Sequence, residues 1–261
     1  MKKNGFMKRS AISVSEIFTT NQGEGKYVGA RNLFVRFNNC NIKCSYCDTK
    51  DDINSQYLYY EAVTFSRRYK KFRNPVSYDK IFLLIERLLK KNSYECISFT
   101  GGEPLLNSDF LLPAMKKIKS GYYNDIRLLI ETNGTLYDEM KKIRGLTDIV
   151  SMDIKLPSSS QNRPLWQEHK KFLKVISGLE IYIKLVVDNR TNLKEIIRTA
   201  AMLKKYSRKK NLIVFIQPVN YNNEFKFFND MKKMIKWQNI FLKEGVTARI
   251  LPQIHKLIGE K

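Results

Sequence analysis

Apolar residues along the chain follow two different periods, and these periods predict the elements of the fold. Short apolar runs are typical of strands, whereas apolar positions repeated every three or four residues are typical of helices. The short runs predict strands at 33–37, 96–99, 126–130, 148–154, 181–187 and 212–216. The longer pattern predicts helices from Ser77 through 89, from Pro104 to Gly121, and at 136–144, 166–177, 192–206 and 224–243.

The alternation of these strands with helices predicts an α/β fold. Six such units imply a parallel sheet with right-handed crossovers, curled into an incomplete (β/α)6 barrel of the TIM type. A chain of 261 residues with 43% apolar content can bury a full core, and no linker rich in Gly, Ser or Pro divides it. Residues 1–261 are therefore expected to form a single domain, with residues 50–76, rich in Tyr, Lys and Arg, as an insertion.

The formal net charge of +22 is the most unusual feature of the composition. Such a surface could attract a polyanion such as RNA. The charges are spread along the chain, however, and the densest stretches at 67–73 and 204–210 favour a solvated basic surface over a nucleic-acid partner. Because the sequence has no run of about 18 apolar residues and no signal peptide at its start, we expect a soluble, cytoplasmic protein without a membrane partner.

Three of the four cysteines, Cys40, Cys44 and Cys47, lie within eight residues. Three thiolates on one short loop can bind a cubane iron–sulfur cluster and leave its fourth iron open to a small ligand. A closed zinc site needs a fourth ligand, and the other candidates are Cys96 in an apolar run and two distant histidines. A disulfide framework is disfavoured because the chain is long and its cysteines are clustered.

Polar segments follow the ends of most predicted strands. The cysteines follow the first strand, and segments 100–104, 131–134, 151–155 and 217–218 follow later ones. Each segment alone is typical of an ordinary turn. Because ligands of parallel α/β folds bind beyond the carboxyl ends of the strands, their convergence predicts one ligand site at that rim.

The Cys-x3-Cys-x2-Cys spacing and the Gly-Gly-Glu-Pro segment resemble motifs of the radical S-adenosylmethionine (SAM) enzymes. The resemblance covers about residues 12–219 and implies a [4Fe-4S] cluster on Cys40, Cys44 and Cys47, with SAM as its further ligand. It also implies that cleavage of SAM gives a 5′-deoxyadenosyl radical. It leaves open whether Ser151 or Lys155 contacts SAM. By this resemblance the SAM-binding residues are Tyr46, Gly101, Gly102, Glu103, Glu131, Asn133, Ser151 and Lys155.

Within that superfamily, the segment 16–25 resembles the 7-carboxy-7-deazaguanine synthases, as do Phe34-Val35-Arg36, Asp48-Thr49 and the terminal stretch 249–256. The resemblance implies the conversion of 6-carboxy-5,6,7,8-tetrahydropterin to 7-carboxy-7-deazaguanine with loss of ammonia. It assigns Thr49 to a magnesium ion, and it makes the C-terminal segment 246–261 a wall of the substrate pocket. The implied substrate-binding residues are Gln22, Gly23, Glu24, Arg36, Thr100, Gln217, Gln253 and His255.

The residue chemistry fits these roles, although plainer interpretations stay open. The Glu24 carboxylate can accept two parallel hydrogen bonds from the guanidine-like edge of a pterin. Arg36 can hold the substrate carboxylate or form an internal salt bridge. Thr49 could belong to a plain Asp-Thr turn, and His255 could be a packing residue.

Two other functions are weighed against the synthase. The Asp-Ile-Lys at 153–155 is reminiscent of activases that install glycyl radicals in partner proteins, and a noncatalytic metal- or RNA-binding module is a more remote alternative. For the synthase we expect a flavodoxin or ferredoxin as electron donor and a homodimer. The insertion at 50–76 could cap the site, form dimer contacts or recognise the electron donor.

Overall fold

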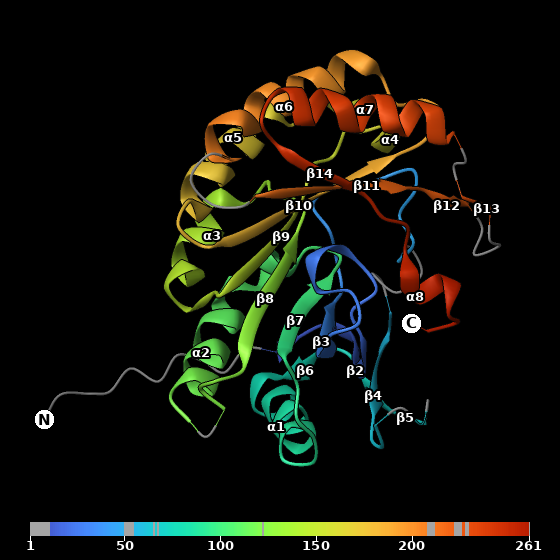
Figure 1. The fold of residues 1–261 in the computed structure, drawn as a ribbon. Coiled ribbons are helices and arrows are strands. Elements are labelled where there is room, and N and C mark those ends of the chain that lie inside the picture. Colours follow the sequence, from blue (N-terminus) through green and yellow to red (C-terminus); the bar gives the residue numbers. More distant parts are fainter. Residues whose placement is uncertain are drawn as a thin grey trace, which may run out of the picture.

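One curved sheet of ten strands forms the centre of the fold (Figure 1). This computed structural model describes residues 11–49, 55–64, 66, 68–121, 123–207, 212–221, 226–227 and 230–260. All predicted strands are confirmed and lie side by side in parallel, in sequence order. They are β3 (Arg31–Phe37), β7 (Cys96–Gly101), β8 (Arg127–Thr132), β9 (Ile149–Asp153), β10 (Glu180–Val187) and β11 (Ile213–Pro218).

Four further strands extend the sheet at its two ends. Beyond β3, β2 (Val14–Asn21) pairs antiparallel with it, and β4 (Tyr57–Glu61) and β5 (Tyr69–Arg73) follow. Beyond β11, β14 (Thr247–Ile250) adds a parallel strand. Because β5 and β14 are the two edges of the sheet, the barrel is not closed. Two short pairs lie outside this sheet: β1 (Ala11–Ile12) with β6 (Val76–Ser77), and β12 (Asn220–Tyr221) with β13 (Lys226–Phe227).

The described part of the 50–76 insertion is therefore a β-hairpin that widens the sheet. Residues 50–54, 65 and 67 lie outside the described residues, as do residues 1–10 at the start of the chain. The hairpin was not recognised as strands because its lysines and arginines mask the alternation: Lys70 and Lys71 are exposed, whereas Leu58 and Tyr60 on the neighbouring strand are buried.

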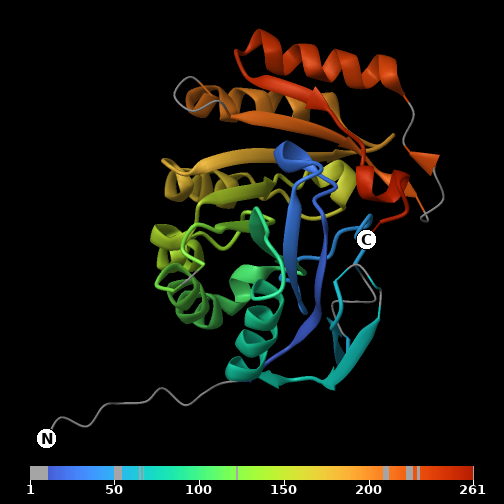
Figure 2. The same cartoon turned by 60° about the horizontal axis from the view of Figure 1, so that its bottom comes forward.

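The main helices cover the outer face of the sheet (Figures 1 and 2). Ser77 begins the first of them as predicted, and its hydroxyl caps the backbone N–H of Lys80. The main helices are α1 (Tyr78–Leu89), α2 (Ser108–Lys119), α3 (Tyr137–Ile143), α5 (Trp166–Ile176), α6 (Leu193–Ser207) and α7 (Met231–Lys243). The short ones are η1 (Gly25–Tyr27), η3 (Pro104–Asn107), η4 (Arg144–Leu146), α4 (Pro157–Ser160) and α8 (Ile254–Leu257).

Two helix starts differ from the prediction. The segment after Pro104 begins as η3 and becomes α-helical only at Ser108. The helix predicted from 224 begins at Met231, because the Asp230 side chain caps the N–H of Lys233 at 3.0 Å. Residues 224–225 and 228–229 of that prediction lie outside the described residues. Among the described helices, none combines the length and apolar character that crossing a bilayer requires.

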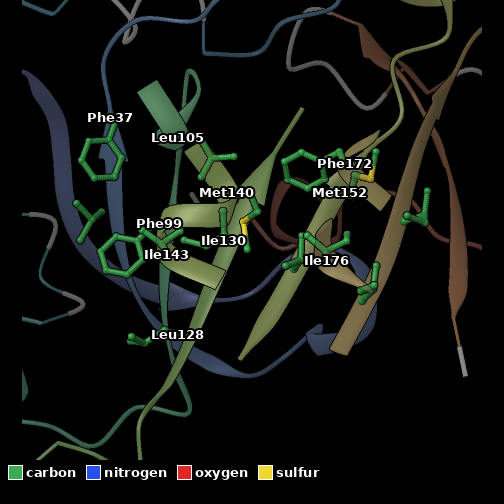
Figure 3. Close-up of a cluster of buried hydrophobic side chains, with 14 of the residues drawn as sticks. Phe37, Phe99, Leu105, Leu128, Ile130, Met140, Ile143, Met152, Phe172 and Ile176 are labelled. Carbon is green, nitrogen blue, oxygen red and sulfur yellow. The ribbon is translucent and has the colours of Figure 1, made fainter. Parts of the chain in front are cut away.

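Alternation along the central strands separates the core from a polar inner face. On β7, Ile97 and Phe99 point outward into the main core, whereas Thr100 faces the inside. Figure 3 shows strand residues such as Ile130 and Met152 packed against side chains of α3 and α5. The inner face has a small apolar cluster toward the amino-terminal halves of the strands, and polar side chains at the carboxyl ends. The inner cluster consists of Cys96, Leu129, Ile149, Tyr182 and Phe215.

Candidate active site

The carboxyl ends of the parallel strands open into one cavity of about 740 Å³ on the inner face of the sheet. It is also lined by the loop after β3, by the segment before η1 and by the C-terminal segment around α8. Every residue that the sequence assigned to a site lines this cavity, with the exception of Glu103. They are Gln22, Gly23, Glu24, Arg36, Cys40, Cys44, Tyr46, Cys47, Thr49, Thr100, Gly101, Gly102, Glu131, Asn133, Ser151, Lys155, Gln217, Gln253 and His255.

The three cysteines of the loop after β3 are free, half-buried thiols. Burial raises the pKa of both the Cys40 and Cys44 thiols, an effect that a bound metal would reverse. The described residues contain no group of three or more His, Cys, Asp or Glu side chains close enough to hold a single metal ion. A closed tetrahedral zinc site needs four such ligands, whereas three thiols on one cavity wall suit the larger cubane cluster.

The cysteine loop is anchored to the loop after β9. The backbone N–H of Ser45 donates to the Ser160 carbonyl at 2.9 Å, and its hydroxyl donates to the Ser159 carbonyl at 2.8 Å. Arg190 reaches both partners, since its guanidinium donates to the Ser45 hydroxyl and to the Ser159 carbonyl. The buried Asp188 carboxylate in turn binds Arg190. These contacts fix the direction in which the cysteines face.

Gly101 and Gly102 are required by the approach of two backbones. A Cβ on Gly102 would lie 1.8 Å from the Asn39 carbonyl oxygen, and one on Gly101 would lie 2.4 Å from the Phe37 carbonyl oxygen. Gly101 also has a φ of +115°, which only glycine adopts without strain. The resemblance to radical SAM enzymes assigns both glycines to SAM binding. The structure adds that their missing side chains also make room for the cysteine loop.

We expect Gly102→Ala to abolish cluster loading, because the added methyl group must displace the backbone that precedes Cys40. Such overpacking typically costs about 1–3 kcal/mol, and a clash with backbone is harder to relieve than one with a flexible side chain. Iron content after anaerobic reconstitution measures the effect. Gly145→Ala is the matched control, since a Cβ there meets nothing within 4 Å. Full iron content in Gly102→Ala would contradict this account.

Glu103 is buried beneath the cavity rather than exposed in it. Its carboxylate accepts hydrogen bonds from the Thr132 hydroxyl at 2.8 Å and from the N–H groups of Asn133 and Leu105 at 2.8 and 3.1 Å. Burial raises the pKa of Glu103 to about 7 despite these donors. The Glu103 side chain thus joins the loops after β7 and β8. The predicted contact of Glu103 with SAM can therefore come only from its backbone, or indirectly through the two loops that it joins.

Neither Cys96 nor His169 lines the cavity with the three loop cysteines. Cys96 is the first residue of β7, so it lies at the opposite end of the parallel strands from the cavity. His169 is fully buried on α5, where its Nε2 lies 3.1 Å from the Asn133 carbonyl oxygen. Burial lowers the pKa of His169 to about 4, so its ring stays neutral. Neither residue can complete a zinc site with the three loop cysteines.

We expect Cys96→Ser to leave the visible absorbance and the iron content of the reconstituted protein unchanged. The hydroxyl would sit in the apolar inner cluster, so a loss of about 1–3 kcal/mol in unfolding free energy is expected instead. Cys44→Ser is the comparison that should lose the cluster. A bleached Cys96→Ser protein would make Cys96 a ligand.

One part of the cavity wall is held together by Glu131. Its carboxylate accepts hydrogen bonds from Gln22 Nε2 at 2.8 Å and from the Thr100 hydroxyl at 2.9 Å. Asn133 serves the cysteine loop instead, because its amide donates to Asn41 Oδ1 at 2.8 Å and lies 3.8 Å from Cys40 Sγ. The residues predicted to bind SAM and those predicted to bind substrate are therefore interlocked.

Glu24 is the centre of a buried polar network. Its carboxylate pairs with Lys184 of β10 and accepts hydrogen bonds from Gln217 Nε2 at 3.0 Å and Gln253 Nε2 at 2.7 Å. Burial alone would raise the pKa of Glu24, but the neighbouring charges, Lys184 foremost, and the hydrogen bonds from Lys184 and Gln253 together outweigh burial and lower that pKa well below its usual range. Glu24 is therefore an anion at neutral pH, with three donors around it.

The C-terminal segment packs against the polar network around Glu24. Gln253 also donates to Asp48 at 3.0 Å, and Lys256 pairs with Asp48 at 3.2 Å. Gly23 accepts a hydrogen bond from the N–H of Ile254 at 2.9 Å, and its lack of a Cβ makes room for the His255 ring. His255 thus lines the cavity and packs on Gly23, and its contact with the substrate stays a prediction.

Two further ion pairs line the cavity. Arg36 forms the internal salt bridge weighed in the sequence, with its Nε 3.1 Å from Glu16 Oε2, and it lies over the Phe18 ring at 5.3 Å. Lys155 pairs with Asp153 at 2.6 Å. Ser151 is buried in the wall nearby, two residues before Asp153 on β9. A contact of Ser151 or of Lys155 with SAM stays a prediction.

Comparison with known proteins identifies the family. Residues 34–229 match the radical SAM superfamily. The 7-carboxy-7-deazaguanine synthase of Geobacter sulfurreducens is 31% identical over 256 residues, which cover 97% of this chain and 100% of that enzyme. The chain belongs to the 7-carboxy-7-deazaguanine synthase family of radical SAM enzymes. The corresponding enzyme of Methanopyrus kandleri is 30% identical and covers 95% of this chain and 93% of its own.

The fold agrees with this family. The crystal structure of QueE from Escherichia coli superposes with a TM-score of 0.56 at 18% identity, covering 92% of this radical SAM chain and 93% of that one. A radical SAM methyltransferase from Sphaerobacter thermophilus gives a TM-score of 0.55 at 13% identity, over 85% of this chain and 66% of that one. As a radical SAM enzyme the chain uses a [4Fe-4S] cluster and SAM, and the cysteine loop fits that cluster.

Proposed function

We propose that this radical SAM enzyme converts 6-carboxy-5,6,7,8-tetrahydropterin to 7-carboxy-7-deazaguanine with loss of ammonia. The observation that supports this substrate most directly is the anionic, buried Glu24 in the same cavity as the three cysteines. A pterin presents adjacent N–H donors on its 2-amino edge, and a carboxylate held rigidly by Gln217 and Gln253 is a complementary acceptor.

The residues of the chain bind, orient and enclose the reactants. When bound, the cluster and SAM supply a carbon radical that removes one hydrogen atom from the substrate. Cys40, Cys44 and Cys47 hold the cluster on one wall, and Arg36 offers guanidinium N–H groups to the substrate carboxylate. The C-terminal segment 246–261 closes the pocket through Gln253 and His255, which keeps water away from the reacting atoms.

Several finer features belong to the same proposal. Thr49 supplies a hydroxyl to a magnesium ion, because hard oxygen donors suit that cation and the Thr49 hydroxyl lines the cavity beside Cys47. The whole chain acts as one domain and forms a homodimer. The net charge of +22 favours a small acidic electron donor, a flavodoxin or a ferredoxin. The exposed lysines of the β4–β5 hairpin belong to this basic surface.

The alternatives have less support. Three curated relatives that cover nearly the whole chain at about 30% identity carry the name of the synthase, which disfavours a glycyl-radical activase. A noncatalytic metal- or RNA-binding module is disfavoured by membership of the superfamily.

Anaerobic reconstitution tests the function. The iron-loaded protein is incubated with the carboxytetrahydropterin, SAM, a reductant and magnesium, and the products are separated by chromatography. We expect 7-carboxy-7-deazaguanine and ammonia in equal amounts, with a lower rate when magnesium is omitted. Cleavage of SAM with the pterin returned untouched would contradict the synthase, and a protein that binds no iron would contradict the enzyme class.

A further inference from the structure

We propose that Asn162 donates an N–H···S hydrogen bond to the Cys44 thiolate and thereby raises the reduction potential of the bound cluster. In the structure Asn162 Nδ2 lies 3.3 Å from Cys44 Sγ. The residue comes from the loop after β9, far from the cysteine motif in the sequence. The proposal needs only the cluster on the three cysteines, so it does not depend on which substrate the enzyme uses.

The orientation of the Asn162 amide is fixed by a second contact. Nδ2 also donates to the Ser160 carbonyl oxygen at 3.4 Å. A carbonyl oxygen can only accept, so the amide atom near it must be the NH2 group rather than the oxygen. The same NH2 group therefore faces Cys44 as a donor, and the contact with sulfur does not rest on an arbitrary choice between the two amide atoms.

The local backbone is shaped to bring Asn162 to this place. Pro157 begins the short helix α4, and Gln161 ends it in the left-handed conformation with a φ of 60°. A non-glycine residue in that conformation is strained, which is common where a site needs a particular geometry. Immediately before it, the carbonyls of Ser159 and Ser160 accept the two hydrogen bonds from Ser45. The donor and the thiol thus belong to two segments that are bound to each other.

Each cluster cysteine has a polar neighbour, but the contact at Cys44 is the shortest. Asn133 Nδ2 lies 3.8 Å from Cys40 Sγ, and the Thr49 hydroxyl lies 3.5 Å from Cys47 Sγ, where either atom could be the donor. Hydrogen bonds to the sulfurs are one of the levers that set the potential of an iron–sulfur cluster. The reduced cluster carries one more negative charge, so a donor stabilises it more than the oxidised form.

A redox titration of the reconstituted enzyme tests the proposal. The cluster takes one electron from dithionite, and its reduced form is followed by electron paramagnetic resonance without SAM. Asn162→Leu keeps the size of the side chain and removes the donor. We expect a reduction equilibrium about tenfold less favourable, which is a fall of about 59 mV for a one-electron couple, at unchanged iron content. Asn162→Asp should lower the potential further, because a carboxylate adds a negative charge.

The control is Asn124→Leu, on an exposed turn before β8 at the other end of the strands, which should keep the wild-type potential. A wild-type potential in iron-loaded Asn162→Leu would overturn the proposal. If Asn162→Leu fails to bind iron, Asn162→Asp is the deciding variant, because the aspartate side chain has the same shape as asparagine. A wild-type reduction potential in iron-loaded Asn162→Asp would also overturn the proposal. The potential is measured without a pterin, so failure here is separate from failure of the synthase reaction.

Discussion

Glu24→Gln should lower kcat/KM for the carboxytetrahydropterin on the order of 100-fold, with no loss of iron. The amide keeps the shape of the side chain but replaces one acceptor oxygen with a donor, so it cannot accept two N–H groups from the pterin edge. Hydrogen bonds to charged groups contribute about 1.5–3 kcal/mol, and each 1.36 kcal/mol is a factor of ten. Turnover under anaerobic conditions and iron analysis of the same sample measure the two effects.

Glu86→Gln provides the matched control for this variant. Glu86 is on α1, away from the cavity, and pairs with Lys90 at 3.3 Å on the helix surface. Such exposed pairs contribute little, so turnover should match that of the wild type. Loss of iron in Glu24→Gln would show that Glu24 supports the cluster loop instead. Unchanged turnover would remove it from substrate recognition.

Much of the site could be predicted from one pattern, the alternation of inward and outward side chains along the strands. Because side chains alternate along a strand, the apolar Leu33, Val35 and Phe37 on one face of β3 predicted that Arg36 faces the other side, and it lines the cavity as expected. The same register places Glu131, Ser151 and Gln217 inside the sheet at the carboxyl ends of their strands. Parallel strands bring their carboxyl ends to one rim of the sheet. Local sequence patterns were therefore enough to predict that residues far apart in the sequence lie in one site.

The parts that the sequence did not reveal are those where both faces of an element are covered, or where a partner is distant. Strand β2 has no visible alternation, since its polar Glu16 and Thr19 are buried along with Ile17. Lys184 is the one charged residue in the apolar run 181–187 of β10, and only its inward register signals an ion pair with Glu24. Asn162 carries no local signal, because its contact with Cys44 depends on the docking of two loops.

Lys184→Met should destabilise the protein more than any other single change considered, by about 3–5 kcal/mol. Removing one member of a buried ion pair leaves the other charge without compensation, and both side chains are largely buried, at 14% and 12% exposure for Lys184 and Glu24. Urea unfolding of the anaerobically purified protein, followed by circular dichroism, measures the loss. Lys26→Met is the control, because Lys26 pairs with Glu180 at the surface.

The double variant Glu24→Gln/Lys184→Met separates stability from function. With neither charge present, most of the lost unfolding free energy should return, whereas pterin turnover should stay as low as in Glu24→Gln.

The pKa of Glu24 is lowered by folding, so the ion pair's contribution to stability is present above about pH 4.3 and declines as the pH falls below that value. The pKa of Lys184 is raised, so the contribution is also present below about pH 10.4 and declines above it. In Lys184→Met the buried Glu24 lacks its main counter-charge, so its pKa rises and protonation relieves the variant as the pH falls. The difference in stability between wild type and Lys184→Met should therefore be largest at neutral to mildly alkaline pH, and it should narrow both toward acid pH and above about pH 10.4. Additive losses in the double variant would contradict a direct pairing of the two charges.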